Sequence, residues 1–399
     1  MFSHDGRLMA TASEDSTAVV WDARTGDQLH RFVGGGPLAV AFSADDRTLF
    51  TVGAEGLLLA WNVGGRQLAL GEDSSAPAEE YSLSLPAPDG HTVVRTRSGR
   101  LWFENTATGR RIGVPSPTRD ETFIWSRDAH WLLSFGPDNV VTLWNASDGS
   151  VAARSHPFEV RDRSLGAVFG PDAKQVYVHD GTSLHTLSRE SMRPAYPEIY
   201  VGEQPVLVPH PVDGSVFILR AGGSFVRMNP KTGDVLATAT RGLLSNEDPD
   251  GLVSPDGTRM VVNGPGRRVR LLDVDKQEYV GTDSKTPWGS SPTFAPDGSQ
   301  FALVQAERIR LWDGRTGEYQ ASLPLPSRTA TFSIVYRPDS TGLVIASTDG
   351  RTWTVDTRTN KWVDRACATA ARNLSVEEWQ QFFPAKPYES TCPQWPAGA

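Results

Sequence analysis

A short phrase that recurs along almost the whole chain constrains the fold more than any other feature. In it an apolar residue, often tryptophan, is followed by a small or acidic polar residue, as in Trp21-Asp22 and Trp312-Asp313. Successive copies lie 40 to 44 residues apart. A fixed period of this length indicates an array of similar supersecondary units. The apolar members are Trp21, Trp61, Phe103, Trp144, Leu187, Met228, Leu272, Trp312 and Val355.

A second phrase, of the type Pro-Asp-Gly, precedes many copies of the first by about 15 residues. Proline presets φ, and aspartate or glycine tolerates the remaining turn positions, so the phrase predicts tight turns. Two runs of alternating apolar and polar residues follow it, for example 301–305 and 308–313. Such runs predict paired antiparallel strands. One period then holds four strands, which is one propeller blade, and the apolar residue of the first phrase packs between blades.

Phrases such as SPDGTRMVV…VRLLD (254–273) and APDGSQFALV…IRLWDGRTG (295–317) resemble the WD-repeat β-propellers of multidomain bacterial proteins. The resemblance covers residues 2–360 and implies an all-β propeller. The Gly-His pair that opens many eukaryotic repeats is absent, so the Asp-His-Ser-Trp hydrogen-bond network of those repeats is not carried over to this chain.

Nine blade motifs can be counted. The preferred arrangement is a closed seven-bladed ring at 81–366, preceded by two blade motifs at 1–80. The first of these lacks a strand, because the sequence starts at the end of its innermost strand; this start suggests a truncated or mis-started product. A single larger ring is the alternative. Residues 66–70 or 361–366 would supply a closing outer strand.

Residues 367–399 change character and predict a short helical tail. Ser375 resembles an N-cap, and acidic residues follow it in the first turn. We expect Trp379, Phe382 and Phe383 to pack on the propeller rim, and Pro384 to end the helix.

The tail resembles the C-terminal ends of WD-repeat regions in actinobacterial signalling proteins, where propellers follow STAND/NACHT-type or transcription-regulator modules. No such module is present here, so the resemblance implies a partner-binding or sensory arm.

Composition and charge narrow the function classes. The chain has 399 residues, 39% hydrophobic and 22% charged, and a formal net charge of -8. This is a globular composition without an apolar run long enough for a membrane span, and mixed charges do not favour nucleic acid. No export signal is visible, which predicts a cytoplasmic monomer. Cys367 and Cys392 are then expected to be reduced; a membrane span upstream in the full gene product would favour an extracytoplasmic location and a disulfide.

A search for chemistry finds no catalytic motif. The eight histidines lack metal-ligand spacing, and the nearest pair is His179 and His185. No G-x-S-x-G elbow, P-loop or G-x-G-x-x-G fingerprint occurs, and most carboxylates recur with the turns. We therefore expect no enzyme activity, metal or cofactor. Two alternatives stay open: an enzyme or small-ligand binder that uses the central channel, and a non-functional remnant of a larger protein.

Binding of another protein is the favoured function, because the loops between the second and third strands of all blades share one face. Arginine and tryptophan are enriched in binding hot spots, although solvated loops are the alternative reading. The loop residues are Glu14, Asp15, Glu55, Arg97, Asp138, Asp180, Arg220, Arg267, Arg268, Glu307, Arg308 and Asp349. The candidate partner-binding residues are Arg220, Arg267, Arg268, Trp288 and Arg308, where Trp288 is expected to be exposed.

Overall fold

The structure is a computed structural model of the chain. Its described residues form two compact units, Met1–Val355 and Asp356–Ala399. Residues outside the description are 14–16, 34–36, 44–45, 54–57, 64–80, 161–164, 240–241, 282–285, 306–307, 326–330, 359, 363, 365–366, 368–371, 383–386, 391 and 397–399.

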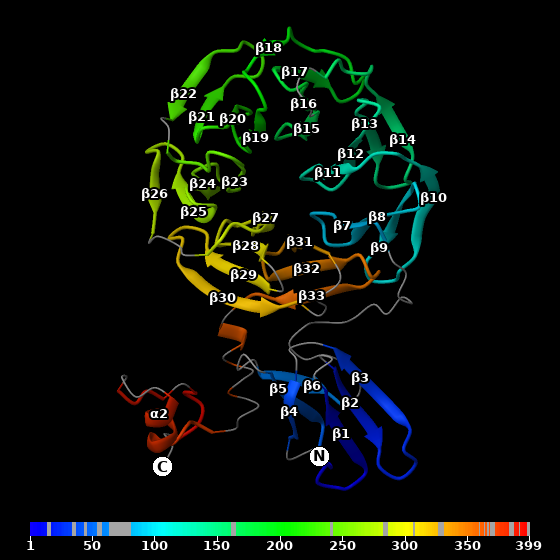
Figure 1. The fold of residues 1–399 in the computed structure, drawn as a ribbon, viewed down its shortest axis with the longest axis vertical. Coiled ribbons are helices and arrows are strands. Elements are labelled where there is room, and N and C mark those ends of the chain that lie inside the picture. Colours follow the sequence, from blue (N-terminus) through cyan, green and yellow to red (C-terminus); the bar gives the residue numbers. More distant parts are fainter. Residues whose placement is uncertain are drawn as a thin grey trace. The chain divides into compact units, whose positions relative to one another are not determined.

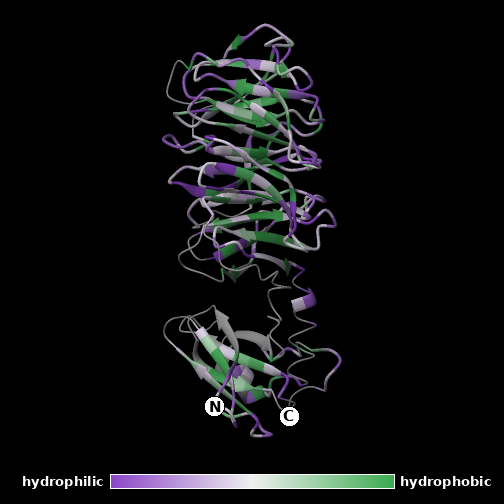
Figure 2. Cartoon of the chain, turned by 90° about the vertical axis from the view of Figure 1, so that its right-hand side faces the viewer, coloured by the Kyte–Doolittle hydropathy of each residue, from purple (hydrophilic) through white to green (hydrophobic). Residues whose placement is uncertain are grey.

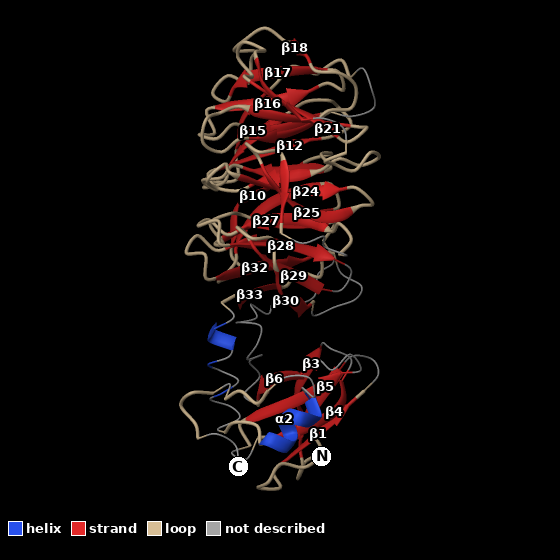
Figure 3. Cartoon of the chain, turned by 90° about the vertical axis from the view of Figure 1, so that its left-hand side faces the viewer, coloured by secondary structure: helices blue, strands red, loops and turns tan. Residues whose placement is uncertain are grey.

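Nine antiparallel sheets make up the first unit, and strands that are consecutive in the chain are neighbours in each sheet (Figures 1 and 3). This confirms the predicted all-β propeller fold. Two three-stranded sheets come first: β1 (Leu8–Ala12), β2 (Thr17–Asp22), β3 (Gln28–Val33), then β4 (Pro37–Phe42), β5 (Thr48–Gly53), β6 (Leu58–Asn62).

Seven further sheets follow, six of four strands and a last one of three. Their strands are β7 (Leu83–Pro86), β8 (Thr92–Arg97), β9 (Arg100–Asn105), β10 (Arg111–Pro117); β11 (Thr122–Trp125), β12 (Trp131–Phe135), β13 (Thr142–Asn145), β14 (Val151–Arg154); β15 (Gly166–Phe169), β16 (Gln175–His179), β17 (Ser183–Ser188), β18 (Ile199–Tyr200); β19 (Val206–Pro209), β20 (Val216–Arg220), β21 (Ser224–Met228), β22 (Val235–Ala239); β23 (Gly251–Val253), β24 (Arg259–Gly264), β25 (Arg268–Asp273), β26 (Glu278–Val280); β27 (Ser290–Phe294), β28 (Gln300–Gln305), β29 (Arg308–Asp313), β30 (Tyr319–Pro324); β31 (Phe332–Tyr336), β32 (Gly342–Ser347), β33 (Thr352–Asp356).

The repeated phrases account for the local structure of each sheet. In the β27–β30 sheet the Pro-Asp-Gly phrase forms the turn before β28: Asp297 accepts the backbone N–H of Ser299 at 2.9 Å, and Gly298 has a φ of 71°. Asp313, which ends β29, accepts the N–H of Thr316 at 2.8 Å and so forms the next turn. The polar residue of the dipeptide is therefore a turn-forming residue, because its carboxylate satisfies backbone donors.

The apolar residue of the dipeptide packs between neighbouring sheets. Trp312 is 1% exposed and stacks on Phe301 of the adjacent strand at 5.1 Å between ring centroids. The same buried cluster contains Val261 and Leu271 of the preceding sheet. Apolar residues lie mainly in the strands, and hydrophilic residues lie mainly in the loops (Figure 2). Truncating such a tryptophan to alanine typically costs about 3–5 kcal/mol.

Sheets β7–β10 to β31–β33 lie in chain order around a common centre (Figure 1). The ring closes where β7 lies beside β31 and β32. Buried Arg95 of β8 crosses this seam and donates to the carbonyl oxygen of Gly350 at 2.8 Å, while the Tyr81 N–H donates to Thr348 O at 2.7 Å. The first and the last of these seven sheets are thus in contact, as expected for a closed seven-bladed ring. The division of the chain into domains at residue 80 stays a prediction.

Two segments, 66–70 and 361–366, were expected to supply the outer strand that closes the ring. Residues 66–70 lie outside the described part of the chain. Of residues 361–366, the described ones are Lys361, Trp362 and Asp364; they are helical and therefore do not form a strand. The first sheet has the expected incomplete innermost strand, which is reduced to a bridge between Phe2 and Met9.

The second unit contains helix α2 (Val376–Phe382), which begins directly after the predicted N-cap Ser375. Trp379 is buried and contacts Tyr388 of its own unit edge to face at 5.7 Å. The side chain of Phe382, together with Phe383 and Pro384, lies outside the described residues, and packing of the tail on the rim stays a prediction.

Cys367 and Cys392 form a disulfide, so the expectation of reduced cysteines is wrong. The sequence argument relied on compartment, whereas the fold of the tail brings the two Cα atoms to 5.4 Å, within bonding range. Buried Asn373 ties the same segment together: it accepts the Cys392 N–H at 2.8 Å and donates to Trp395 O at 2.9 Å.

Candidate functional site

The predicted arginine and tryptophan residues come from three consecutive sheets. Arg220 ends β20, and Arg308 begins β29. Arg267 lies in the loop between β24 and β25, and its backbone carbonyl accepts the N–H of Trp288 at 2.6 Å. Arg268 forms an isolated bridge with Pro287, next to Trp288 in the chain. The structure thus brings Arg267, Arg268 and Trp288 together; we call these three residues the arginine loop.

The two arginines are exposed, whereas Trp288 is less exposed than the sequence predicts. Arg267, with a side chain 61% exposed, and Arg268 are exposed, and Arg267 forms an ion pair with Asp248 at 3.1 Å. Trp288 was expected to be exposed but is half-buried, because its ring packs against the apolar cluster that contains Phe301. Of the three residues of the arginine loop, the two arginines are exposed and Trp288 is half-buried.

The half-buried carboxyl of Asp250 contacts the side chain of Trp288 in the arginine loop. Burial raises the pKa of Asp250, and the nearby Asp248 acts in the same direction, although hydrogen bonds from the Gly251 N–H at 2.8 Å and the Trp288 side chain oppose the shift. Trp288 therefore links the loop to the apolar cluster through its ring and to Asp250 through its indole N–H. Arg267 lies in the left-handed region of the backbone at a φ of 57°.

Arg220 and Arg308 lie in the sheets on either side of the arginine loop. Arg308 donates from Nε to Ser322 Oγ at 2.9 Å. Arg220 is half-buried, and its Nε has no hydrogen-bond partner among the described residues. These two residues flank the arginine loop and are not shown to contact it.

A second feature lies at the opposite ends of the strands, where the innermost strands end in the Pro-Asp-Gly turns. A cavity of about 710 Å³ opens there, and every one of the seven sheets contributes to its wall. The wall is mainly apolar and includes aliphatic side chains and seven prolines of the turns and neighbouring strands. The prolines are Pro88, Pro171, Pro209, Pro211, Pro255, Pro296 and Pro338.

Each of the seven turns around this mouth contains one aspartate. Each accepts the backbone N–H two residues ahead, as Asp256 does from Thr258 at 3.1 Å. Burial opposes their ionisation, but hydrogen bonds from their own turns outweigh it and lower the pKa of Asp128, Asp213, Asp256 and Asp297. The seven residues are Asp89, Asp128, Asp172, Asp213, Asp256, Asp297 and Asp339.

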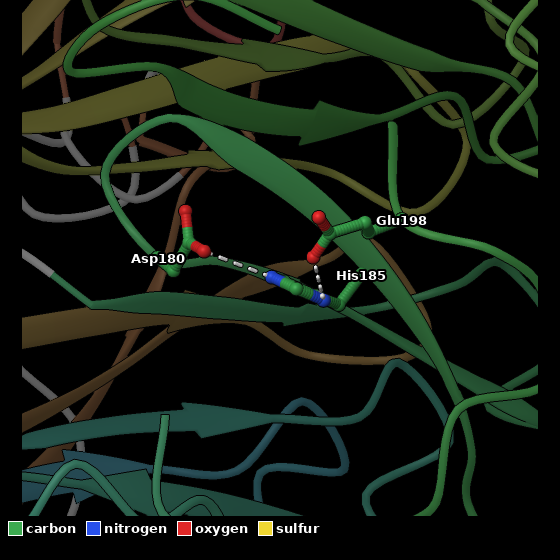
Figure 4. A group of neighbouring side chains, drawn as sticks. All are labelled: Asp180, His185 and Glu198. Atoms are coloured by element: carbon green, nitrogen blue, oxygen red, sulfur yellow. Dashed lines mark hydrogen bonds and ion pairs between the residues drawn. The ribbon is translucent and has the colours of Figure 1, made fainter. Parts of the chain in front are cut away.

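A third feature is a histidine held between two carboxylates (Figure 4). His185 Nε2 lies 3.1 Å from Asp180 Oδ2, and His185 Nδ1 lies 3.8 Å from Glu198 Oε2. This is a group that could hold a metal ion within the described residues. The two carboxylates face opposite nitrogens of the imidazole ring (Figure 4), and one ligand atom from each of the three residues lies within 4.8 Å of the others. The spacing of histidines in the sequence did not predict this group. Of the nearest pair, His179 and His185, only His185 belongs to it.

The β11–β14 sheet contains a Trp-Ser-Asp hydrogen-bond network, which is part of the Asp-His-Ser-Trp network of eukaryotic repeats. The sequence did not predict that network in this chain. The indole Nε1 of Trp144 donates to Ser134 Oγ at 2.7 Å, and that hydroxyl donates to Asp120. Asp120 lies in the loop before β11, so a carboxylate accepts the serine proton without a Gly-His pair. The network joins buried Trp144 to the loop face.

Within the described residues, no helix is long and apolar enough to cross a membrane. Comparison with known proteins matches the family WD40 (WD domain, G-beta repeat) at residues 1–22.

Two relatives from Arabidopsis thaliana are similar to parts of the chain. A WD repeat-containing protein 26 homolog is 26% identical over 156 residues, covering 36% of this chain and 26% of the relative. Periodic tryptophan protein 2 is 28% identical over 189 residues, covering 44% of this chain and 20% of the relative. The chain thus spans only about a quarter or less of the length of these relatives. The match at residues 1–22, the similarity to these relatives and the nine repeated antiparallel sheets are consistent with a WD-repeat β-propeller fold.

Proposed function

We propose that the chain is a non-catalytic scaffold or sensory arm that binds another protein through the arginine loop, and that it serves a bacterial signalling or regulatory system. The observation that carries the proposal is the pair of exposed, adjacent arginines, Arg267 and Arg268, on a loop anchored by half-buried Trp288. Planar guanidinium groups on a rigid loop bind carboxylates with little loss of conformational entropy.

The surroundings of the loop support this role. Asp248 pairs with Arg267, and Arg268 follows it in the chain with an exposed side chain, so both guanidinium groups lie at the surface. Arg220 and Arg308 add positive charge in the adjoining sheets. A seven-sheet ring at 81–366 would carry this face as one body, in the cytoplasm or, as the disulfide favours, in an oxidising compartment.

The test is capture of partners by the immobilised chain, compared between the native protein and Arg267→Ala/Arg268→Ala. We expect the double variant to lose a specific partner by roughly tenfold or more, since hot-spot arginines cost about 2 kcal/mol on truncation. Trp288→Phe, rather than alanine, probes the aromatic residue without opening the core.

The matched control is Arg154→Ala, an exposed arginine on the outer strand β14. Circular dichroism shows whether each variant is folded. Equal recovery of every partner by the native chain, the double variant and the control would remove the arginine loop from the binding surface.

A further inference from the structure

We propose that a second protein segment docks at the turn-side mouth of the central channel, inserting an apolar side chain into the cavity and placing a lysine or arginine against one arc of the aspartate ring. This inference rests on the proposed role as a protein-binding scaffold, but it concerns a different surface. The turns around Asp256 and the arginine loop lie at opposite ends of β24.

The cavity supplies the apolar half of the site. Its volume of about 710 Å³ is within the range of about 300–1,000 Å³ that is typical of ligand sites. The prolines around its mouth have fixed φ angles, so the wall is rigid before any partner arrives. Aliphatic side chains from five sheets contribute to the wall: Ile124, Val168, Leu207, Leu252 and Val335.

Charge is distributed unevenly around the mouth, and this identifies the partner's chemistry. On one side Asp172 faces Lys174 at 3.6 Å, Asp213 faces Arg227, and Asp128 faces His130 at 3.4 Å. On the other side Asp256, Asp297 and Asp89 form no ion pair with any lysine or arginine that the structure describes. We call these three residues, with Asp339, the acidic arc.

The acidic arc spans four consecutive sheets across the ring closure. Asp339 is the one member with a cation nearby, Arg337 at 3.3 Å, and its own side chain is still 49% exposed. Pro255 and Pro296 line the cavity, and Asp256 and Asp297 directly follow them in the chain. Carboxylates that stay ionised therefore border an apolar opening, and a segment with neighbouring apolar and basic residues complements both.

The hydrogen bonds of the arc allow a clean test. Asp256 and Asp297 accept N–H groups of Thr258 and Ser299, and asparagine can accept the same bonds through its amide oxygen. Asp256→Asn/Asp297→Asn therefore removes two charges and keeps the turns. Asp138→Asn is the matched control, since Asp138 accepts the Val140 N–H at 3.1 Å in a loop at the other end of the strands.

The probe is an immobilised heptapeptide library in which the central residue is leucine, phenylalanine or serine and its neighbours vary among lysine, arginine, glutamate and serine. The labelled full-length chain should bind peptides with an apolar centre and a basic neighbour. Binding should fall roughly tenfold in Asp256→Asn/Asp297→Asn, the effect expected when two exposed charge pairs are lost, and should not change in Asp138→Asn.

Other results overturn the proposal. No enrichment over random peptides, a preference for glutamate, or equal binding of serine-centred peptides would each contradict a combined apolar and cationic site. Loss of peptide binding in Arg267→Ala/Arg268→Ala would place the peptide on the arginine loop instead. Absence of peptide binding alone leaves the capture result for the arginine loop standing, so the two proposals fail separately.

Discussion

The buried histidine His179 shows how a single residue of this fold is controlled by its surroundings. It ends β16, is 8% exposed, and packs so closely on Gly166 that a Cβ there would lie 2.1 Å from its Nε2. Burial lowers its pKa from 6.5 to about 4, although the adjacent Asp180 acts in the other direction. His179 is therefore neutral in the folded chain at pH 7.

This shift makes stability depend on pH. Below pH 6.5 the unfolded chain binds a proton at His179 that the folded chain does not bind until about pH 4. The free energy of unfolding should therefore fall as the pH drops from 7 to 4, by up to about 3 kcal/mol from this residue. Urea unfolding of His179→Gln across this range should show a smaller loss of stability.

The control for this measurement is His156→Gln, which removes an exposed histidine. It should keep the pH dependence of the native chain. If His179→Gln and the native chain lose stability in parallel between pH 7 and pH 4, burial of a neutral His179 is not the cause.

At the scale of elements, the seam between the first and last sheets of the ring depends on one charged side chain. Arg95 is 1% exposed and pairs with Glu104 of its own sheet at 3.3 Å. Its Nη1 donates to Ser84 Oγ at 2.8 Å, and its Nη2 donates across the seam to Gly350 O at 2.8 Å. A guanidinium group thus joins two sheets whose strands are distant in the chain.

Removing Arg95 should destabilise the ring strongly. In Arg95→Ala, Glu104 keeps a buried charge without its partner, which typically costs about 3–5 kcal/mol. Arg95→Met/Glu104→Gln should recover part of this loss, because it removes both charges and keeps most of the volume. Urea unfolding of the two variants measures the difference; a single variant as stable as the native chain would show that the seam is closed by other contacts.

At the scale of the whole molecule, the two N-terminal sheets and the seven later sheets differ in how they are packed. The two N-terminal sheets have their own small core, with Ala10, Val20 and Leu49. The seven later sheets close on each other through the Arg95 seam. We therefore expect limited proteolysis to cut first between β6 and β7 and to leave a resistant fragment that starts near residue 80.

Mass mapping of the surviving core decides between the alternatives. A fragment from about residue 80 onwards would support a seven-sheet ring with two separate sheets before it. Equal protection from residue 1 would favour one larger cooperative body, because a continuous ring opens only as a whole.

The sequence by itself determined the repeat, the strands, the turns and the all-β propeller. These depend on residues within one period: alternation selects the strand faces, and Asp297 or Asp313 bonds to backbone groups two or three residues away. The sequence also placed Arg267 and Trp288 in neighbouring loops. Its misjudgement of Trp288 concerned burial, which depends on the core of an adjoining strand pair.

Only the tertiary structure decided which side chains meet between periods. The Arg95–Gly350 hydrogen bond joins residues 255 positions apart, and the cavity exists because seven turns converge on one axis. Glu198 faces His185 only because β18 folds back onto β17. Local pattern cannot specify such contacts, because they depend on how the sheets stack and on where the ring closes.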